Sequence, residues 1–140
     1  MQLNLSTDIA LRTLIYLGQK GAPATIAEVA ESFDIAKTHL MKVVMALVAA
    51  NLVISERGRN GGIRLAREAR EIRVGEVVQL MENSLALVFC MKEGTSNDDC
   101  PLLPSCRLRK LFCKAQKSFL ASLDESSLAD LLPVKINLTK

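Results

Sequence analysis

The chain has 140 residues, of which 49% are hydrophobic and 24% charged, and its formal net charge is +3. This composition excludes a disordered chain, and the length favours one compact domain or two small ones. No apolar run reaches the roughly 18 residues that span a bilayer, and the first residues lack a signal-peptide pattern, so we expect a cytoplasmic protein without a membrane partner.

A first helix is predicted over STDIALRTLIYLGQKG. Ser6 or Thr7 can cap its start, and Asp8 falls in its first turn, where negative charge is favoured. Gly21 follows its last turn and is suited to the left-handed conformation that ends many helices.

Residues 25–51 carry the pattern of a helix-turn-helix. Thr25 and Glu28 form a capping box at the start of a short helix, and Ala30 is the small residue expected where two helices cross. Asp34 stands in the turn, where the backbone needs a residue that tolerates positive φ. A longer helix follows and ends near Asn51; its apolar stripe has the spacing i, i+3, i+4, i+7 and consists of Leu40, Val43, Val44 and Leu47.

The next segment, LVISERGRNGGIRLAR, predicts a β-hairpin with the turn sequence Asn60-Gly61-Gly62. Six arginines and three glutamates lie between residues 55 and 73. Residues 1–73 hold ten Lys and Arg against seven Asp and Glu, whereas residues 74–140 hold eight of each. Three helices and a basic hairpin predict a winged helix-turn-helix that binds double-stranded DNA, over residues 1–73.

The DNA-contacting residues are expected on two elements. A helix fits the major groove, and arginines on a wing reach phosphates or the minor groove. The candidates are Lys37, Thr38, His39 and Lys42 on the third helix, and Arg57, Arg59, Asn60 and Arg64 on the hairpin. The alternative is a three-helix module that uses its wing for protein contacts. His39 is the one histidine and fits the surface of the recognition helix better than a metal site.

Residues 74–140 are predicted to be helical around a cysteine-containing loop. A fourth helix spans residues 73–83, a long helix starts near Pro104, and a short last helix stops at Pro133. The apolar stripe of the long helix predicts a symmetric dimer, although it could instead pack on its own winged domain. Its members are Leu108, Leu111, Phe112, Ala115, Phe119 and Leu123. The predicted fold is thus mainly α with a small β-wing, a winged helix-turn-helix plus a long dimerisation helix.

All four cysteines, Cys90, Cys100, Cys106 and Cys113, lie in one stretch of 24 residues. Their spacing contains no close pair of the kind zinc sites use, whereas loops can deliver thiolates to an iron–sulfur cluster at irregular spacing. Cys106 is expected in the first turn of the long helix, where negative charge is favoured. Cys113 lies two turns, roughly 10.5 Å, further along and is expected to be a separate thiol, either a partly buried bystander or an oxidation-prone thiolate.

Four stretches together resemble the Rrf-two family of bacterial winged-helix transcriptional regulators. They are MQLNLSTDIALRTLIYL, RGRNGGIRL, IRVGEVVQLME and the cysteine stretch with its helix, CPLLPSCRLRKLF, and the likeness covers essentially the whole chain. Within the family the chain is similar to members that repress transcription and sense nitric oxide. The resemblance implies a homodimer, DNA release on exposure to nitric oxide, and no enzymatic activity.

The resemblance also implies the ligands of a cluster. Cys90, Cys100 and Cys106 would hold a 4Fe–4S cluster, with a 2Fe–2S cluster as the alternative, and Asp8 of the partner subunit would complete it. Some members that sense cluster status use a histidine shortly after the third cysteine, and this chain has Arg107, Leu108 and Arg109 there. An iron- or cluster-status sensor of the same family is the alternative function; a zinc-stabilised DNA-binding protein and a redox protein are further ones.

Overall fold

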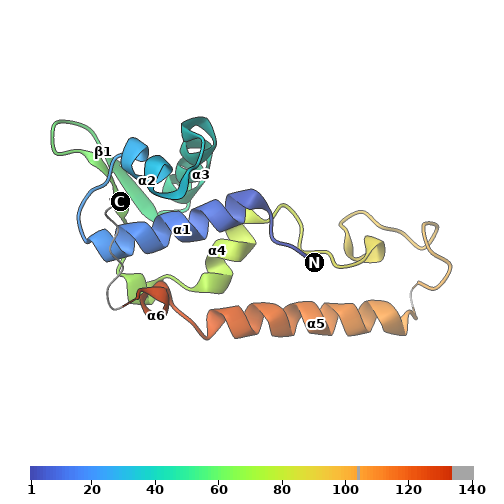
Figure 1. The fold of residues 1–140 in the computed structure, drawn as a ribbon. Helices are drawn as coiled ribbons and strands as arrows, with labels where there is room; N and C mark the ends of the chain where they lie inside the picture. The colour runs from blue at the N-terminus through green and yellow to red at the C-terminus, as the bar shows by residue number, and fades with distance from the viewer. Residues whose placement is uncertain (104, 134–140) are drawn as a thin grey trace.

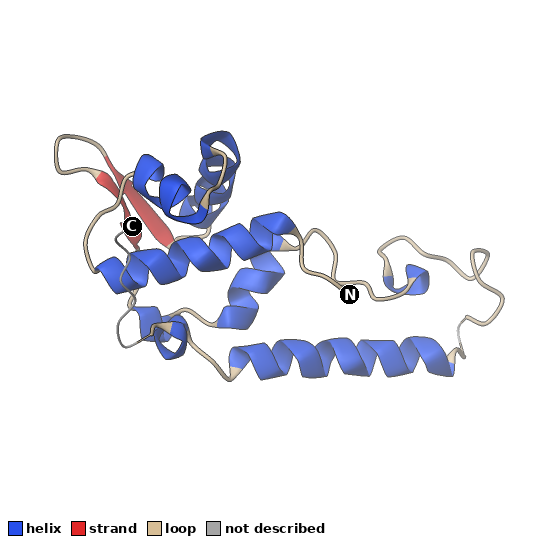
Figure 2. Ribbon diagram, viewed as in Figure 1, coloured by secondary structure: helices blue, strands red, loops and turns tan. Residues whose placement is uncertain are grey.

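The computed structural model describes residues 1–103 and 105–133 and confirms a mainly helical fold with one two-stranded wing (Figures 1 and 2). In chain order the elements are α1 (Leu5–Lys20), α2 (Ile26–Phe33), α3 (Lys37–Ala49), β1 (Val53–Glu56), β2 (Gly62–Leu65), the 3₁₀ turn η1 (Ala69–Glu71), α4 (Val74–Met81), the 3₁₀ turn η2 (Phe89–Met91), α5 (Arg107–Asp124) and α6 (Leu128–Leu131). Within the described ranges, no helix combines the length and apolar character that crossing a membrane requires.

The start of α1 corrects one prediction. Asn4, and not Ser6 or Thr7, caps the helix, and its side-chain oxygen accepts a hydrogen bond of 2.8 Å from the backbone N–H of Thr7. Thr7 is therefore inside the helix, where it is fully buried, and its hydroxyl is used for a tertiary contact. The predicted end is confirmed, because Gly21 adopts φ 62° and its N–H bonds to the carbonyl of Leu17.

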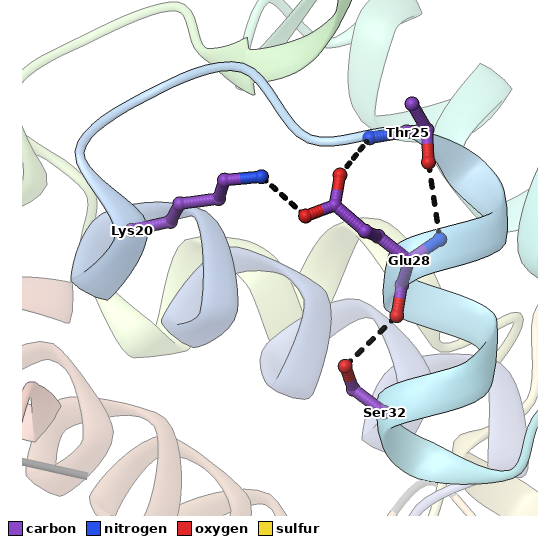
Figure 3. Close-up of polar contacts among 4 residues, drawn as sticks. All are labelled: Lys20, Thr25, Glu28 and Ser32. Atoms are coloured by element: carbon purple, nitrogen blue, oxygen red, sulfur yellow. Dashed lines mark hydrogen bonds and ion pairs between the residues drawn. The ribbon is translucent and has the colours of Figure 1, made fainter. Parts of the chain in front are cut away.

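The helix-turn-helix has the predicted local chemistry. Figure 3 shows the capping box of α2, in which Thr25 and Glu28 satisfy each other's backbone N–H groups. Asp34 takes a left-handed φ of 53°, so the turn does use the residue that stands in place of glycine. The four stripe residues of α3 are buried as predicted, and α3 ends at Ala49, with Asn51 at φ 57°.

The wing is held to the rest of the domain at its base. β1 and β2 are antiparallel, and Ile63 exchanges backbone hydrogen bonds of 2.8 and 2.9 Å with Ala24, which precedes α2. A Cβ on Gly62 would lie 2.6 Å from the carbonyl oxygen of Ala24, and Gly62 has φ 145°, so this glycine permits the close approach. Gly62, a residue of the predicted turn, is the first residue of β2 and joins the wing to the helices.

One hydrophobic core spans both halves of the chain. Ile72 and Val77, the latter from α4, pack with Leu128 of α6 in the same cluster as α1, α3 and the wing. The predicted division at residue 73 is thus not a break in the core, and a functional division there stays a prediction. α5, in contrast, has no buried residue and in Figure 1 lies on the opposite side of α1 from α3.

The long helix starts later than predicted. Pro104 lies outside the described residues, and α5 begins at Arg107. Cys106 is its N-cap and not part of its first turn, because its ψ of 111° is extended rather than helical. The thiol therefore lies immediately before the free N–H groups of the helix, and its sulfur accepts a hydrogen bond from the N–H of Arg109 at 3.4 Å.

Glu28 supplies a test of local stability. A hydrogen bond from the Lys20 ammonium, aided by the Thr25 N–H, holds the pKa of Glu28 below its ordinary value of 4.5 (Figure 3). A lowered pKa adds stability above pH 4.5 that is lost as the pH falls through the folded-state value. We expect Glu28→Gln, which can keep the cap, to cost about 0.5–1 kcal/mol at neutral pH, because the side chain is 41% exposed and water screens the pair.

Urea unfolding at pH 7 and pH 3 measures this difference. The wild type and Glu28→Gln should differ more at pH 7 than at pH 3. An equal gap at both pH values would mean that the charge of Glu28 does not contribute.

Candidate DNA interface and cysteine segment

The amino-terminal half of α3 presents three of its four predicted DNA-contacting residues around a shallow hollow of about 390 Å³. Thr38, His39 and Lys42 line this hollow together with Ser6 of α1 and Met81 of α4. Lys37, Thr38 and Lys42 are exposed, whereas His39 is half-buried. Because α3 follows the turn at Asp34, these side chains lie at the end of the helix that usually contacts base edges.

The arginines of the wing differ in their partners. Arg57, Arg59 and Asn60 are exposed at the tip. Arg64 lies on β2 opposite Ile54 and forms an ion pair of 2.7 Å with Glu56. Among the described residues no carboxylate lies within ion-pair distance of the guanidinium groups of Arg57 and Arg59. The tip arginines therefore carry the charge that is available to an anionic partner.

Removing one tip arginine should weaken DNA binding in a salt-dependent way. We expect Arg59→Ala to lower the affinity for all duplexes and to reduce the slope of log K against log salt by about 1, because one phosphate contact is lost. Arg64→Ala is the matched control and should change the slope less, since Glu56 already neutralises that charge. Fluorescence anisotropy over a salt series measures both slopes, and an unchanged slope for Arg59→Ala would remove Arg59 from the phosphate contacts.

The start of α1 joins the recognition helix to the segment that leads to the cysteines. Glu82 follows α4, and its carboxylate accepts hydrogen bonds from the N–H of Asn4 (2.8 Å) and the hydroxyl of Thr7 (2.5 Å). The side-chain amide of Asn4 also donates to the carbonyl of Met81 at 2.9 Å. In the same first turn, between Asn4 and Thr7, Ser6 Oγ lies 3.1 Å from His39 Nε2. A displacement of residue 82 would therefore act on α1 and, through Ser6, on α3.

The three cysteines predicted to be ligands lie on one segment but do not meet at one point. Cys90 is in η2, Cys100 lies between two turns, and Cys106 caps α5. All of them are half-buried free thiols. In the part of the chain that the structure describes, no three His, Cys, Asp or Glu side chains are close enough to hold a metal ion.

The donor chemistry of this segment nevertheless fits an iron–sulfur cluster. Thiolates are the usual ligands of such clusters, and Cys106 adjoins the N-terminus of a helix of 18 residues, where negative charge is favoured. Between residues 90 and 106, Leu103 is the one buried side chain among those described, so few packed contacts oppose convergence of the thiols. The local turn from Ser96 to Asp99 holds the pKa of Asp99 low through the Ser96 N–H.

Cys113 lies on α5, as predicted. It is two turns beyond the cap, and it lines a hollow of about 370 Å³ together with Cys106 and the cations Arg109, Lys110, Lys114 and Lys117. Its role as a bystander or a reactive thiol stays a prediction.

Asp8, the predicted fourth ligand, is engaged within its own helix. Both of its carboxylate oxygens contact the Arg12 guanidinium, at 2.8 and 3.1 Å. The Asp8 side chain is 46% exposed, so it remains accessible to a second chain. A ligand role in the partner's cluster stays a prediction, and it would require Asp8 to share or leave Arg12.

Two features of this site were not predicted. The contacts of Glu82 with the start of α1 join residues 75 or more positions apart, and no local pattern indicates such a pairing. The exposed methionines Met41 and Met45 on α3 could have been found, because both fall outside the buried stripe of that helix.

Comparisons with known proteins agree with this architecture. The model of the Rrf2 family, described as an iron-dependent transcriptional regulator, matches residues 3–133. The HTH-type transcriptional regulator NsrR of Oceanobacillus iheyensis is 42% identical over 134 residues, which are 94% of this chain and 90% of that protein.

Solved structures show the same fold. IscR of T. potens superposes with a TM-score of 0.73 at 26% identity, over 94% of this chain and 85% of that one. CymR of B. subtilis, described as a global cysteine regulator, gives a TM-score of 0.73 at 23% identity, over 94% and 95% of the two chains. With a family match over nearly all of its length, a winged helix-turn-helix and a close relative that regulates transcription, this chain belongs to the Rrf2 family of DNA-binding transcriptional regulators.

Proposed function

We propose that this regulator is a homodimeric repressor whose affinity for its operator is set by an iron–sulfur cluster that responds to nitric oxide. The observation that carries the proposal is a path of contacts from Glu82 to the recognition helix. Glu82 lies between α4 and the cysteine segment (residues 90–106), and the path runs from it through the start of α1 to His39 on α3. The 42% identity with NsrR supports the same class of function. A repressor of this kind acts on chromosomal DNA in the cytoplasm.

The homodimer rests on α5. Leu108 and Leu111 are 54% and 61% exposed on a helix without any buried residue, and Phe112 and Phe119 are half-buried. An amphipathic helix of 18 residues gains stability when its apolar side is covered. The second copy is the preferred occupant, because DNA readers of this type bind paired half-sites as symmetric dimers.

The proposed ligands are Cys90, Cys100 and Cys106, with Asp8 of the other subunit as the fourth. We favour a 4Fe–4S cluster over a 2Fe–2S cluster, because three thiolates and one carboxylate leave a single iron without sulfur from the protein. When bound, the cluster would supply an iron with a harder and more exchangeable ligand, which a small molecule such as nitric oxide can reach.

The residues of the chain would transmit the state of this site to DNA. Asp8 would join the α1 helix of one subunit to the cysteine segment of the other, and Glu82 joins the same part of α1 to the end of α4. Loss of the Asp8 contact would free its carboxylate to pair with Arg12 of the same helix and would leave the start of α1 held by Glu82 and by the core of its own subunit. Ser6 would then pass any change in the position of α1 to His39 and the amino-terminal half of α3.

An anaerobic gel-shift experiment tests the proposal. Protein purified without oxygen should carry iron and sulfide, bind a duplex selected by the protein, and release it on addition of nitric oxide. Unchanged DNA affinity after nitric oxide would reject the proposed signal. An iron chelator that releases DNA where nitric oxide does not would support the second candidate, an iron-status sensor, which the iron-dependent description of the family favours.

The coupling path can be tested separately from the cluster. Ser6→Ala should keep the iron content but lower the DNA affinity of the cluster-bound protein about fivefold, because one hydrogen bond that positions His39 is lost. Ser32→Ala is the control, since the hydroxyl of Ser32 bonds only to the carbonyl of Glu28 within α2 among the described contacts (Figure 3). Equal affinities of the wild type and Ser6→Ala would exclude this contact from the path.

A further inference from the structure

The solvent-facing side of α3 carries large apolar side chains. Met41 is 53% exposed, Met45 is 69% exposed and Val48 is 39% exposed. Met41 and Met45 are four residues apart, so they are neighbours on one face of the helix, and Val48 continues that face by one turn. The opposite side of α3 supplies the core, with Leu40, Val43, Val44 and Leu47. The packing of the core therefore does not depend on the side chains of Met41 and Met45.

This apolar face points away from the surface that the proposed dimer would cover. α3 packs against α1, α2 and β1, and in Figure 1 it lies across α1 from α5. Thr38 and Lys42, two predicted DNA contacts, are also exposed, and they lie three residues before Met41 and Met45 respectively, which makes each a neighbour of one methionine on the helix surface. A group of exposed apolar side chains beside cations indicates a partner that is anionic overall but offers apolar groups at close range. The major groove of DNA has this character.

The composition of α3 restricts what it can read. The helix KTHLMKVVMALVA contains no Arg, Asn, Gln, Asp or Glu. Guanine is contacted in the major groove by Arg or Lys, adenine by Asn or Gln, and cytosine by Asp or Glu. Of these residue types, α3 contains only lysine. The apolar group that bases present in the major groove is the 5-methyl group of thymine. Methionine is unbranched and flexible, so it can follow such a methyl group.

We propose that Met41 and Met45 contact the 5-methyl groups of thymines in each half-site, and that these contacts determine which operators the regulator prefers. Met41 and Met45 are about 6 Å apart along the helix, so they reach two different base pairs, which are spaced at about 3.4 Å. The inference rests on the proposed binding to operator DNA and adds the chemical feature that is recognised. Lys42 and the tip arginines supply affinity without this discrimination.

Replacing thymine by deoxyuridine, which differs only by the absent methyl group, tests the inference. The anaerobically purified dimer first selects sites from a pool of random-sequence duplexes. Each thymine of the selected duplex is then exchanged for deoxyuridine, one at a time, and affinity is measured by fluorescence anisotropy. At two positions in each half-site, the exchange of thymine for deoxyuridine should weaken binding about fourfold. This is the effect of burying one methyl group away from water.

The variants Met41→Gln and Met45→Gln show which methionine contacts which of these thymine positions. Each variant should bind thymine and deoxyuridine duplexes equally at one position and keep the difference at the other, with an unchanged salt slope because no phosphate contact is lost. Leu131→Gln is the matched control, since Leu131 is an exposed leucine of α6, and it should keep both differences. Helical circular dichroism checks the fold of each variant.

Two results would overturn the inference while DNA binding stands. One is a wild type that does not distinguish thymine from deoxyuridine in the selected sites. The other is a difference that persists undiminished in both methionine variants, which would assign it to DNA shape or to other residues. Failure to enrich any duplex would reject operator binding itself, and this inference with it.

Discussion

Cys106→Ala is expected to yield a folded dimer that has lost its cluster. Cys106 caps α5 and is one of three thiols on a segment with a single buried side chain among its described residues, so its removal leaves the core intact. The proposed site keeps only two thiolates, too few to retain iron against competing thiols. DNA affinity should fall by about 5- to 150-fold, the usual range for coupling between two sites. Iron and sulfide analysis, the anaerobic absorption spectrum and anisotropy measure these changes.

Cys113→Ala is the matched control for this variant. Cys113 lies in the same helix and lines the same cationic hollow, but the proposed ligand set does not include it. It should keep its iron, its spectrum and its DNA affinity. Iron loss in Cys113→Ala together with retention in Cys106→Ala would contradict the assignment of the third ligand. If Cys106→Ala and the wild type had equal DNA affinity, the cluster would not control DNA binding.

Leu111→Glu is expected to convert the dimer to monomers. Leu111 is 61% exposed in the single chain, so the substitution should leave the fold of each chain unchanged. In a symmetric interface the two copies of residue 111 are both buried, and each would place a carboxylate in an apolar contact. Each central contact is worth about 2 kcal/mol, so the dimer dissociation constant should rise by at least about 100-fold. Sedimentation equilibrium measures this constant.

The DNA affinity of Leu111→Glu should be lower than that of the wild type, because each monomer can occupy only one half-site. Leu131→Glu is the control, since it introduces the same charge at an exposed leucine outside α5. It should remain dimeric and bind DNA as the wild type does. A dimeric Leu111→Glu would assign the apolar side of α5 to another partner and remove the structural basis of the proposed dimer.

Much of the local structure could be predicted from neighbouring residues alone. The capping box at Thr25, the turn at Asp34 and the glycine end of α1 follow from hydrogen bonds and backbone preferences within a few positions, and all are confirmed. The errors lie at helix starts, where several polar residues compete for the cap. Asn4 took the place of Ser6 or Thr7 because Thr7 points into the protein and bonds to Glu82.

The sequence by itself determined the helix-turn-helix, the basic wing, the grouping of the cysteines and the amphipathic character of α5, because each depends on spacing along the chain. Only the tertiary structure decided that Glu82 holds the start of α1, that Ser6 contacts His39, and that Glu56 neutralises Arg64 while Arg57 and Arg59 stay exposed. These contacts join side chains of different elements, and their formation depends on how the shared core of α1, α3 and α4 orients those elements. Periodicity carries no information about that orientation.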